Sequence, residues 1–300
     1  MRASRLRRGL RFVAVLGVLS LAVPDPSVRP ATISLTTVET ARAVDFGDGM
    51  LWVLALGSDA RPGTDVAEGL TDSIQLIGID WRTGRAVGIG IPRDAWIELP
   101  DGEARINTAL RDAGPQGAAD AVAEIVGIPP DLVLVTGFAG FLSMVDALGG
   151  VEVESPVAFR TDDDGLAVRR GTNAFTSEEA LDYARTRRVL EGGDLDRSAN
   201  HQRLLLGALR QLRDHEDVEG FMEDVALAAI SGLQTDLSPR ELYRLVQALT
   251  TVDPSRATSC VIGGTPGTEF GASIIRLDLA QARALGDDAR EDARLEGGCR

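Results

Sequence analysis

The chain has 300 residues, of which 44% are hydrophobic and 25% are charged, and its formal net charge at pH 7 is −14. This length and apolar fraction suit one large α/β domain, or two small ones, with a sizeable core. The acidic balance argues against nucleic acid as a partner, because the phosphate backbone demands a basic surface.

The N-terminal residues 1–23 have the pattern of an export signal. Five arginines lie within residues 1–11, and an uncharged apolar run, Phe12–Val23, follows them. A basic stretch before a short apolar segment is typical of a signal peptide or a signal-anchor, with the arginines kept inside the cell. We therefore expect the rest of the chain to lie outside the cytoplasm, either anchored through its N-terminus or secreted.

Residues 24–49 mix small and polar side chains without a period, which indicates an extracytoplasmic linker. The globular part is expected to begin near Met50. Three apolar runs then follow and read as buried strands, at Leu51–Leu56, Ile74–Ile79 and Ala86–Ile91.

A charged group stands beside each of these three strands. Asp59 follows the first, Asp72 precedes the second, and Arg93 follows the third. Sheets of α/β proteins commonly build their sites at strand ends, so these side chains are expected to gather at one edge.

The later elements are predicted mainly from apolar periodicity and turn residues. Residues 160–173 are rich in Asp, Arg and Gly and are expected to form a surface loop. Helices are expected at 108–125, 138–148, 177–185, 196–213, 217–233, 238–249 and 278–285, and strands at 132–135, 151–154 and 273–277.

The two cysteines, Cys260 and Cys299, both lie near the C-terminus. In an exported protein they can form one disulfide that closes a loop of roughly forty residues. Two unrelated thiols are the alternative.

Asp59 and Asp72 are candidate metal ligands. Carboxylate oxygens are natural ligands of Mg²⁺, which takes further oxygens from water and substrate phosphate; Mn²⁺ is the alternative ion. Taken singly, each aspartate could instead be an ordinary turn residue or helix cap. The two histidines, His201 and His215, are not clustered as a zinc site would require.

A second cluster of charge lies between Tyr183 and Arg203. Arg185, Arg187, Arg188 and Arg197 surround a glycine-rich acidic turn. Alone, this could be a solvated helix end with salt bridges. Together with Arg61 and Arg93 it indicates a clamp for a polyanion, and arginines plus one divalent ion are the minimal equipment for phosphoryl transfer.

Six motifs in this order resemble those of the LytR-CpsA-Psr family of cell-wall glycopolymer ligases. The resemblance covers about residues 50–213. The motifs are LGSDARPG, TDSIQLIGID, GIPRDAWIELP, RINTALRDAGP, GFLSMVDALGGVEV and ALDYARTRRVLEGGDLDRSANHQR.

The resemblance implies a three-layer α/β/α domain over residues 50–250, with a central mixed sheet and an apolar lipid-binding tunnel. Residues 251–300 would be a C-terminal extension holding the disulfide. The implied activity attaches a glycopolymer, such as a teichoic acid or arabinogalactan, from polyprenyl pyrophosphate to peptidoglycan and releases polyprenyl phosphate. Residues 138–148 and 204–212 are candidate tunnel walls, or ordinary core.

The same resemblance implies roles for individual residues. The general base is left open between Asp72 and Asp94. The implied metal ligands are Asp59 and Asp72, the implied catalytic residues Arg93, Asp94, Arg185, Arg187 and Arg197, and the implied substrate-binding residues Arg61, Arg105, Asn107, His201 and Gln202.

Three departures from the family pattern bear on activity. Leu70-Thr71 stands where an Arg usually precedes the second aspartate, Asp196 replaces a Gly, and Asn200-His201-Gln202 replaces Arg-Gln-Gln. They motivate a second hypothesis, a catalytically weakened polyprenyl-phosphate-binding regulator of envelope assembly. A DNA-binding regulator is disfavoured by the acidic charge. A glycosidase, which two carboxylates alone could suggest, is disfavoured by the arginines.

Overall fold

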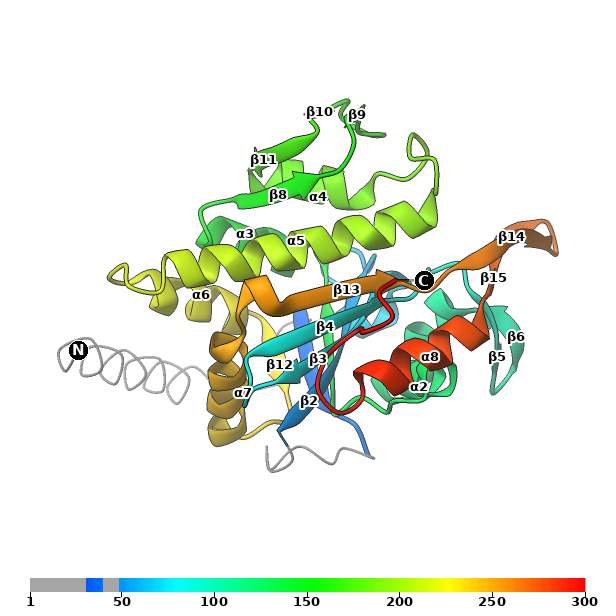
Figure 1. The fold of residues 1–300 in the computed structure, drawn as a ribbon, viewed down its shortest axis with the longest axis horizontal. Coiled ribbons are helices and arrows are strands. Elements are labelled where there is room, and N and C mark those ends of the chain that lie inside the picture. The colour runs from blue at the N-terminus through cyan, green and yellow to red at the C-terminus, as the bar shows by residue number, and fades with distance from the viewer. Residues whose placement is uncertain (1–30, 40–48, 300) are drawn as a thin grey trace.

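The computed structural model describes residues 31–39 and 49–299, so the expected signal at 1–23 and most of the expected linker lie outside the described residues. A seven-stranded mixed sheet forms the centre of the molecule (Figure 1). Its strands, in spatial order, are β12 (Leu233–Thr235), β1 (Ile33–Thr37), β7 (Leu132–Thr136), β2 (Met50–Ser58), β3 (Thr71–Asp80), β4 (Arg85–Gly90) and β13 (Ala257–Val261).

The strand directions bring several strand ends to one edge of the sheet. β2, β3 and β4 form an antiparallel meander, while β7 runs parallel to β2 and β13 runs parallel to β4. The end of β2, the start of β3 and the end of β4 therefore lie side by side, as the three apolar runs predict.

Helices cover both faces of the sheet and give the three layers. α2 (Ala109–Val126) and α8 (Leu279–Ala289) pack on one face, in the same hydrophobic cluster as Leu54 and Leu56. Val53, one residue from Leu54, contributes to a second cluster, with α7, on the other face. This alternation is the period of a strand that is buried on both sides. The predicted mixed α/β fold is confirmed; the lipid tunnel remains a prediction.

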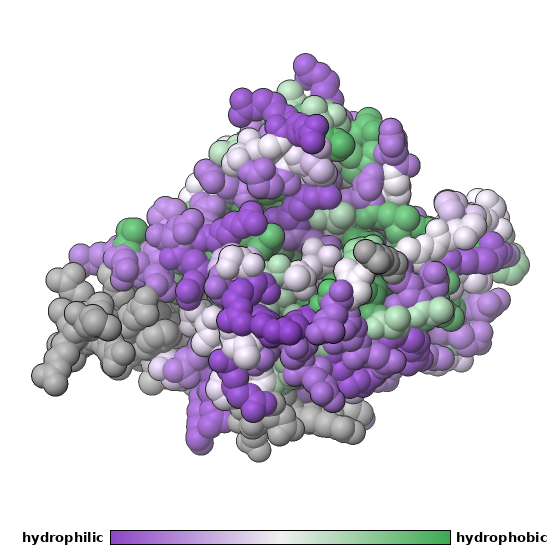
Figure 2. Space-filling view, in the orientation of Figure 1, coloured by the Kyte–Doolittle hydropathy of each residue, from purple (hydrophilic) through white to green (hydrophobic). Residues whose placement is uncertain are grey.

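The remaining helices lie on the side of the second face. They are α3 (Phe138–Ala147), α4 (Ser177–Arg185), α5 (Asp194–Asp214), α6 (Phe221–Ile230) and α7 (Pro239–Thr251). α4 packs on α3 and α5. Thr176 caps α4 through a capping box with Glu179. None of the helices in the described ranges is long and apolar enough to cross a membrane. Figure 2 shows that the viewed face is mostly hydrophilic, with hydrophobic residues in smaller patches.

Short hairpins and turns complete the fold. The strands outside the central sheet are β5 (Trp96–Leu99), β6 (Gly102–Arg105), β8 (Val151–Ser155), β9 (Phe159–Arg160), β10 (Ala167–Val168), β11 (Gly171–Phe175), β14 (Gly264–Glu269) and β15 (Ala272–Leu277), and the 3₁₀ turns are Val66–Glu68, Ile106–Thr108 and Pro254–Arg256.

Three boundary predictions are wrong. Part of the expected linker, 24–49, is β1, whose Ile33 and Leu35 are buried between β7 and β12. The expected helix 217–233 ends at Ile230, because Gly232 turns the chain into β12. The expected extension 251–300 contributes β13 to the central sheet. In each case pairing with a distant strand determines the structure, and local pattern does not reveal it.

The expected loop at 160–173 also contains regular structure. β9 pairs with β10, and β11 pairs with β8. Asn173 stabilises the turn between β10 and β11. Its side chain accepts from the Arg169 N–H and donates to the carbonyls of Arg169 and Gly171. The turn between β9 and β10, residues 161–166, is the part that faces the candidate site.

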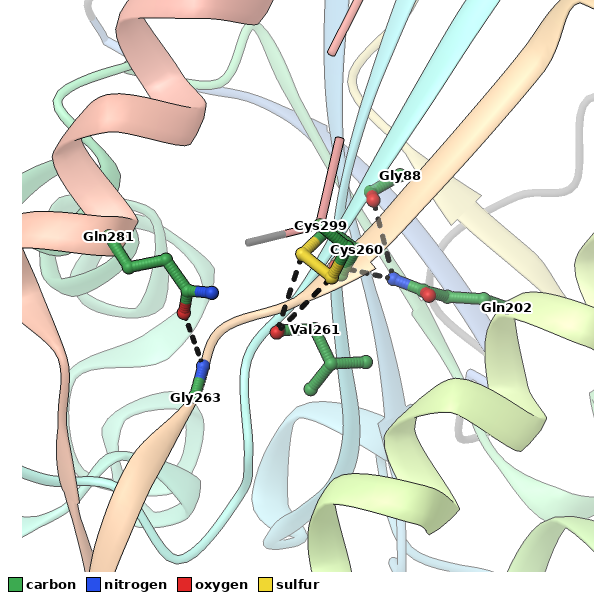
Figure 3. The surroundings of a disulfide bond; sticks show 7 residues. All are labelled: Gly88, Gln202, Cys260, Val261, Gly263, Gln281 and Cys299. Atoms are coloured by element: carbon green, nitrogen blue, oxygen red, sulfur yellow. Dashed lines mark hydrogen bonds between the residues drawn. A yellow bond between two sulfur atoms is a disulfide. The ribbon is translucent and has the colours of Figure 1, made fainter. Parts of the chain in front are cut away.

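The predicted disulfide between Cys260 and Cys299 is formed (Figure 3). It ties the C-terminal segment to β13, beside the point where Gln202 of α5 donates to the carbonyls of Gly88 and Cys260. The two cysteines are 39 residues apart in the sequence. The disulfide therefore closes the loop between residues 260 and 299. One end of this loop is β13, the strand to which Gln202 of α5 bonds.

Replacing both cysteines with serine is expected to lower the free energy of unfolding by up to about 4 kcal/mol, the loop-entropy value for this separation. Urea unfolding of the oxidised protein and of the double variant measures the difference. Adding a thiol reductant should lower the stability of the wild type and leave the variant unchanged. Equal stabilities in oxidising buffer would contradict the structural role of the bond.

Candidate functional site

Asp72 occupies a β-bulge at the shared edge of the sheet. Gly57 pairs with Ser73 and Ser58 pairs with Thr71, which leaves Asp72 as the extra residue of β3. A bulge of this kind turns a side chain away from its regular direction and is common beside active sites. Asp59 lies next to it, and its Oδ1 accepts the N–H of Leu70 at 2.7 Å.

Arg93 follows β4 and reaches this bulge. Its Nη1 donates to Asp72 Oδ1, its Nε lies 3.6 Å from Asp94 Oδ1, and its backbone N–H donates to Asp194 Oδ2 at 2.9 Å. Burial lowers the pKa of Arg93, but the negative charges of Asp72, Asp94 and Asp194 outweigh it, so the pKa is raised. Arg93 is therefore a fixed cation at the sheet edge.

Arg197 supplies a second cation from the first turn of α5. Its side chain is only 5% exposed and pairs with Asp194, whose side chain is 8% exposed. Burial lowers the pKa of Arg197, Asp194 opposes that shift, and the charge of Arg93 adds to it. Arg197 is thus a largely dehydrated cation close to Arg93.

Three further arginines come from the C-terminal end of α4. Arg185 lies 3.0 Å from Asp163 through its Nη1, and its guanidinium carbon lies 5.7 Å from the centre of the Phe138 ring. Arg187 and Arg188 follow the helix end, where their backbone N–H groups both donate to Asp162 Oδ2. A single acidic side chain thus holds the turn that carries them.

These groups enclose one small, wholly charged pocket of about 140 Å³. Five arginines and three aspartates line it, so its walls carry an excess of positive charge. The lining residues are Asp72, Arg93, Asp162, Asp163, Arg185, Arg187, Arg188 and Arg197. A concave site with several arginines suits a multiply charged phosphate, which accepts bidentate hydrogen bonds from guanidinium groups.

Asp59 and Asp72 together offer donors that fit a hard divalent cation. Both are carboxylates at paired strand ends, and Asp72 lines the pocket. No group of three or more His, Cys, Asp or Glu side chains suited to a metal occurs within the described parts of the chain. A cation here would need its remaining oxygens from phosphate and water, which is the coordination that Mg²⁺ prefers.

Several residues expected in the site lie outside the pocket lining. Asp94 is 8% exposed and accepts from Arg105 Nη1 at 3.3 Å. Asn107 is 1% exposed, and its backbone N–H donates to the Arg93 carbonyl. Neither Asp94, Arg105 nor Asn107 lines the pocket, and Arg61 is exposed in the turn after Asp59. These residues hold or flank the segment that carries Arg93.

The departures at positions 200–202 are built into the fold. Asn200 Oδ1 accepts from the hydroxyl of Tyr183 at 2.8 Å, and His201 Nε2 lies 2.8 Å from the Ala184 carbonyl. Gln202 bonds to the sheet, as described above. All three side chains join α5 to its neighbours, and none lines the pocket.

His201 should make stability depend on pH. Burial lowers its pKa from 6.5 to about 4, with the charge of Arg197 adding to the shift. Because the folded pKa lies below the unfolded one, the neutral ring stabilises the fold fully above pH 6.5, and this contribution is lost as pH falls toward 4. We expect a slope of at most about 1.4 kcal/mol per pH unit in that window.

Urea unfolding between pH 4 and 7 tests this, with His201→Gln as the comparison. The Gln variant should lose stability less steeply than the wild type below pH 6.5. Parallel curves for the two proteins would show that His201 does not titrate as inferred.

The sequence singled out the arginines and the acidic turn that contains Asp194, but it missed the acidic partners Asp162 and Asp163. All three aspartates contact residues of the arginine cluster. The run Asp162-Asp163-Asp164 was the available signal, but it lies more than twenty residues before Arg187. Only the packing of the β9–β10 turn against the end of α4 reveals the contact.

Comparisons with known proteins identify the family and the fold. The model of the LytR_cpsA_psr family matches residues 31–290. The cell wall biosynthesis protein LcpA of Corynebacterium glutamicum is 25% identical over 94% of this chain and 63% of its own length. The polyisoprenyl-teichoic acid–peptidoglycan teichoic acid transferase TagU of Bacillus cereus is 26% identical over 64% of this chain and 62% of its own length. The aligned segments thus span under two thirds of these relatives.

A solved structure shares the fold. It is that of the LytR-CPS2A-psr family protein YwtF (TagT) with bound octaprenyl pyrophosphate lipid, which superposes with a TM-score of 0.62 at 21% identity, over 82% of this chain and 91% of that one.

Proposed function

Because the chain belongs to the LytR-CpsA-Psr family, we propose that it is an extracytoplasmic phosphotransferase of cell-wall assembly. It would move a glycopolymer from a polyprenyl pyrophosphate carrier to peptidoglycan and release polyprenyl phosphate. The observation that carries the proposal is the charged pocket, which five arginines line together with Asp72 at the sheet edge. The teichoic acid transfer for which TagU is named and the lipid bound to YwtF support the choice of substrate.

The proposed reaction is a displacement at phosphorus. A hydroxyl of peptidoglycan attacks the phosphorus nearer the sugar, and the bond from that phosphorus to the bridging oxygen breaks. The polymer then joins the wall through a phosphodiester, and the lipid leaves as its monophosphate. Arg93 and Arg197 would hold the non-bridging oxygens. Arg93 pairs with Asp72 and Arg197 with the buried Asp194, so both need little reorganisation as charge shifts.

Asp72 is the better of the two candidates for the general base. It lines the pocket and stands at the bulge, whereas Asp94 accepts from Arg105 beneath the site. The proton of the attacking hydroxyl would pass to Asp72 or to a water that Asp72 holds.

A divalent ion, Mg²⁺ or Mn²⁺, is part of the proposal, with Asp59 and Asp72 as its ligands. When bound, it would neutralise pyrophosphate charge and stabilise the leaving phosphate. The carboxylate donors support this assignment, as argued above.

The lipid tail is proposed to lie along the helices of the second face. α3 and α6 contact each other, and both carry half-buried apolar side chains, among them Phe141 and Leu142. Leu205 of α5 and Leu227 of α6 are more than two fifths exposed. Anchoring by residues 1–23 would keep the domain near the membrane that supplies the carrier.

Turnover is expected despite the departures from the family pattern. Asn200 and His201 bond to α4 and do not line the pocket, and Asp196 accepts the Gly192 N–H within its own turn. These changes leave the pocket arginines in place. The weakened-regulator hypothesis therefore gains no support from positions 196, 200 and 201.

The test is an assay of polyprenyl phosphate release. Full-length protein in detergent is incubated with a synthetic polyprenyl-pyrophosphoryl sugar, with and without peptidoglycan oligomers and Mg²⁺. Release that needs the acceptor and the ion supports the proposal. Tight binding of the lipid without release under any acceptor would favour the regulator instead. Truncated forms should keep residues 31–39, because β1 belongs to the sheet.

A further inference from the structure

The β9–β10 turn places two adjacent aspartates in the arginine pocket, and they bind in different ways. Asp162 receives backbone N–H groups, from Arg187 at 2.7 Å and from Arg188 at 2.8 Å. Asp163 pairs instead with a side chain, the guanidinium of Arg185, at 3.0 Å. Both aspartates line the pocket, and the next residue, Asp164, does not.

Asp162 has the contacts of a positioning residue. Successive backbone N–H groups that converge on one anion form a nest, and this nest lies in the turn that presents Arg187 and Arg188. Burial raises the pKa of Asp162, but the backbone hydrogen bonds outweigh it and the pKa is lowered. The turn is also held from its other side, because Thr161 Oγ1 donates to Asp182 of α4. Asp162 therefore couples the β9–β10 turn to the end of α4.

Asp163 has the contacts of a competitor. The Asp163 and Arg185 side chains are about half exposed, so their ion pair can open at little cost. The Asp163 carboxylate pairs with the Arg185 guanidinium, to which an incoming phosphate could otherwise bind. It also adds negative charge to a pocket that must take up a polyanion.

We propose that these neighbours set the anion affinity of the pocket in opposite directions. Asp162 positions the arginine turn for a diphosphate. Asp163 pairs with Arg185 until a diphosphate displaces the Asp163 carboxylate from that guanidinium. The inference rests on the proposed function for the class of ligand, and it assigns affinity control to two residues outside the family motifs. A ligand that reaches Arg185 must outcompete Asp163, which disfavours anions of lower charge.

The three consecutive aspartates provide a matched series of variants. Each change to asparagine removes the same single charge within one turn. The probe is inorganic pyrophosphate at constant free Mg²⁺, titrated calorimetrically into full-length protein, with the dissociation constant as the readout. Asp163→Asn should tighten binding about two- to fivefold, the range of an exposed ion pair, and Asp164→Asn should leave it unchanged.

Asp162 is tested by two further variants. Asp162→Ala should weaken pyrophosphate binding roughly tenfold, although it removes the same negative charge as the change at 163. Asp162→Asn keeps an oxygen that can accept the turn N–H groups, so it should restore most of the affinity. If the alanine variant does not fold, the pyrophosphate affinity of Asp162→Asn still tests the positioning role of Asp162.

The outcomes separate this inference from the proposed function. If Asp162→Ala and Asp162→Asn both tighten binding as the change at 163 does, Asp162 is only another repelling charge and its positioning role is overturned. If Asp163→Asn binds like Asp164→Asn, the competition is overturned while the proposed function stands. A wild type that does not bind pyrophosphate would overturn the anion pocket, and with it both proposals.

Discussion

Arg93→Ala is expected to slow polyprenyl phosphate release by about 10²–10³-fold, the cost of removing one preorganised donor to a developing anion. Arg93 is the cation that contacts the bulge residue Asp72, and its backbone is fixed by Asp194 and Asn107. Arg93→Lys should recover only part of the rate, because an ammonium keeps the charge and loses the planar pair of donors. Initial rates at saturating donor measure both effects.

Arg210→Ala is the matched control for this prediction. It removes an arginine from α5, but Arg210 is exposed and does not line the pocket. We expect its rate to stay within about threefold of wild type, as for a screened surface charge. If Arg210→Ala and Arg93→Ala were equally impaired, the pocket described above would not be the catalytic one.

Arg197→Met is expected to reduce both stability and activity. The Arg197–Asp194 pair is almost fully buried, so removing the arginine leaves a buried carboxylate without its counter-charge. Breaking such a pair typically costs about 3–5 kcal/mol, which urea unfolding at pH 7 would detect. Activity should fall as well, since the variant lacks one of the two fixed cations.

The double variant Arg197→Met with Asp194→Asn separates the two effects. An asparagine at 194 removes the unpaired charge and keeps an oxygen for the Arg93 N–H. Stability should return to within about 1–2 kcal/mol of wild type, because both charges are gone together. Activity should remain low. Recovery of activity together with stability would mean that Arg197 acts through the fold alone.

The central strands were predictable because their apolar side chains are consecutive in the sequence. Runs such as Ile74–Ile79 are long, apolar and bounded by turn residues. β1 and β12 are short and contain Ser, Thr or Gln, and only their pairing across the chain makes them strands. β13 likewise depends on β4 and the disulfide. Long-range pairing leaves no periodic signal within such short segments.

The site was predictable to the extent that its residues lie in motifs. The arginines after α4 and at the start of α5, and the carboxylate Asp72, line one pocket as the clustering of charge suggested. Motif membership could not distinguish the residues that line the pocket from those that stabilise the fold around it. Gln202 bonds to backbone carbonyls, and Asp94 accepts from Arg105. The acidic partners at 162 and 163 come from a turn with no motif, so only the structure reveals them.

The most direct test of phosphotransfer follows each phosphorus of the donor separately. Polyprenyl-pyrophosphoryl sugar is labelled on the sugar-side phosphorus in one preparation and on the lipid-side phosphorus in another, and each is incubated with protein, Mg²⁺ and peptidoglycan oligomers. The account predicts that the sugar-side label appears on the peptidoglycan and the lipid-side label appears in polyprenyl monophosphate. Release of both labels as polyprenyl pyrophosphate, with sugar on the acceptor, would show glycosyl transfer and contradict the account.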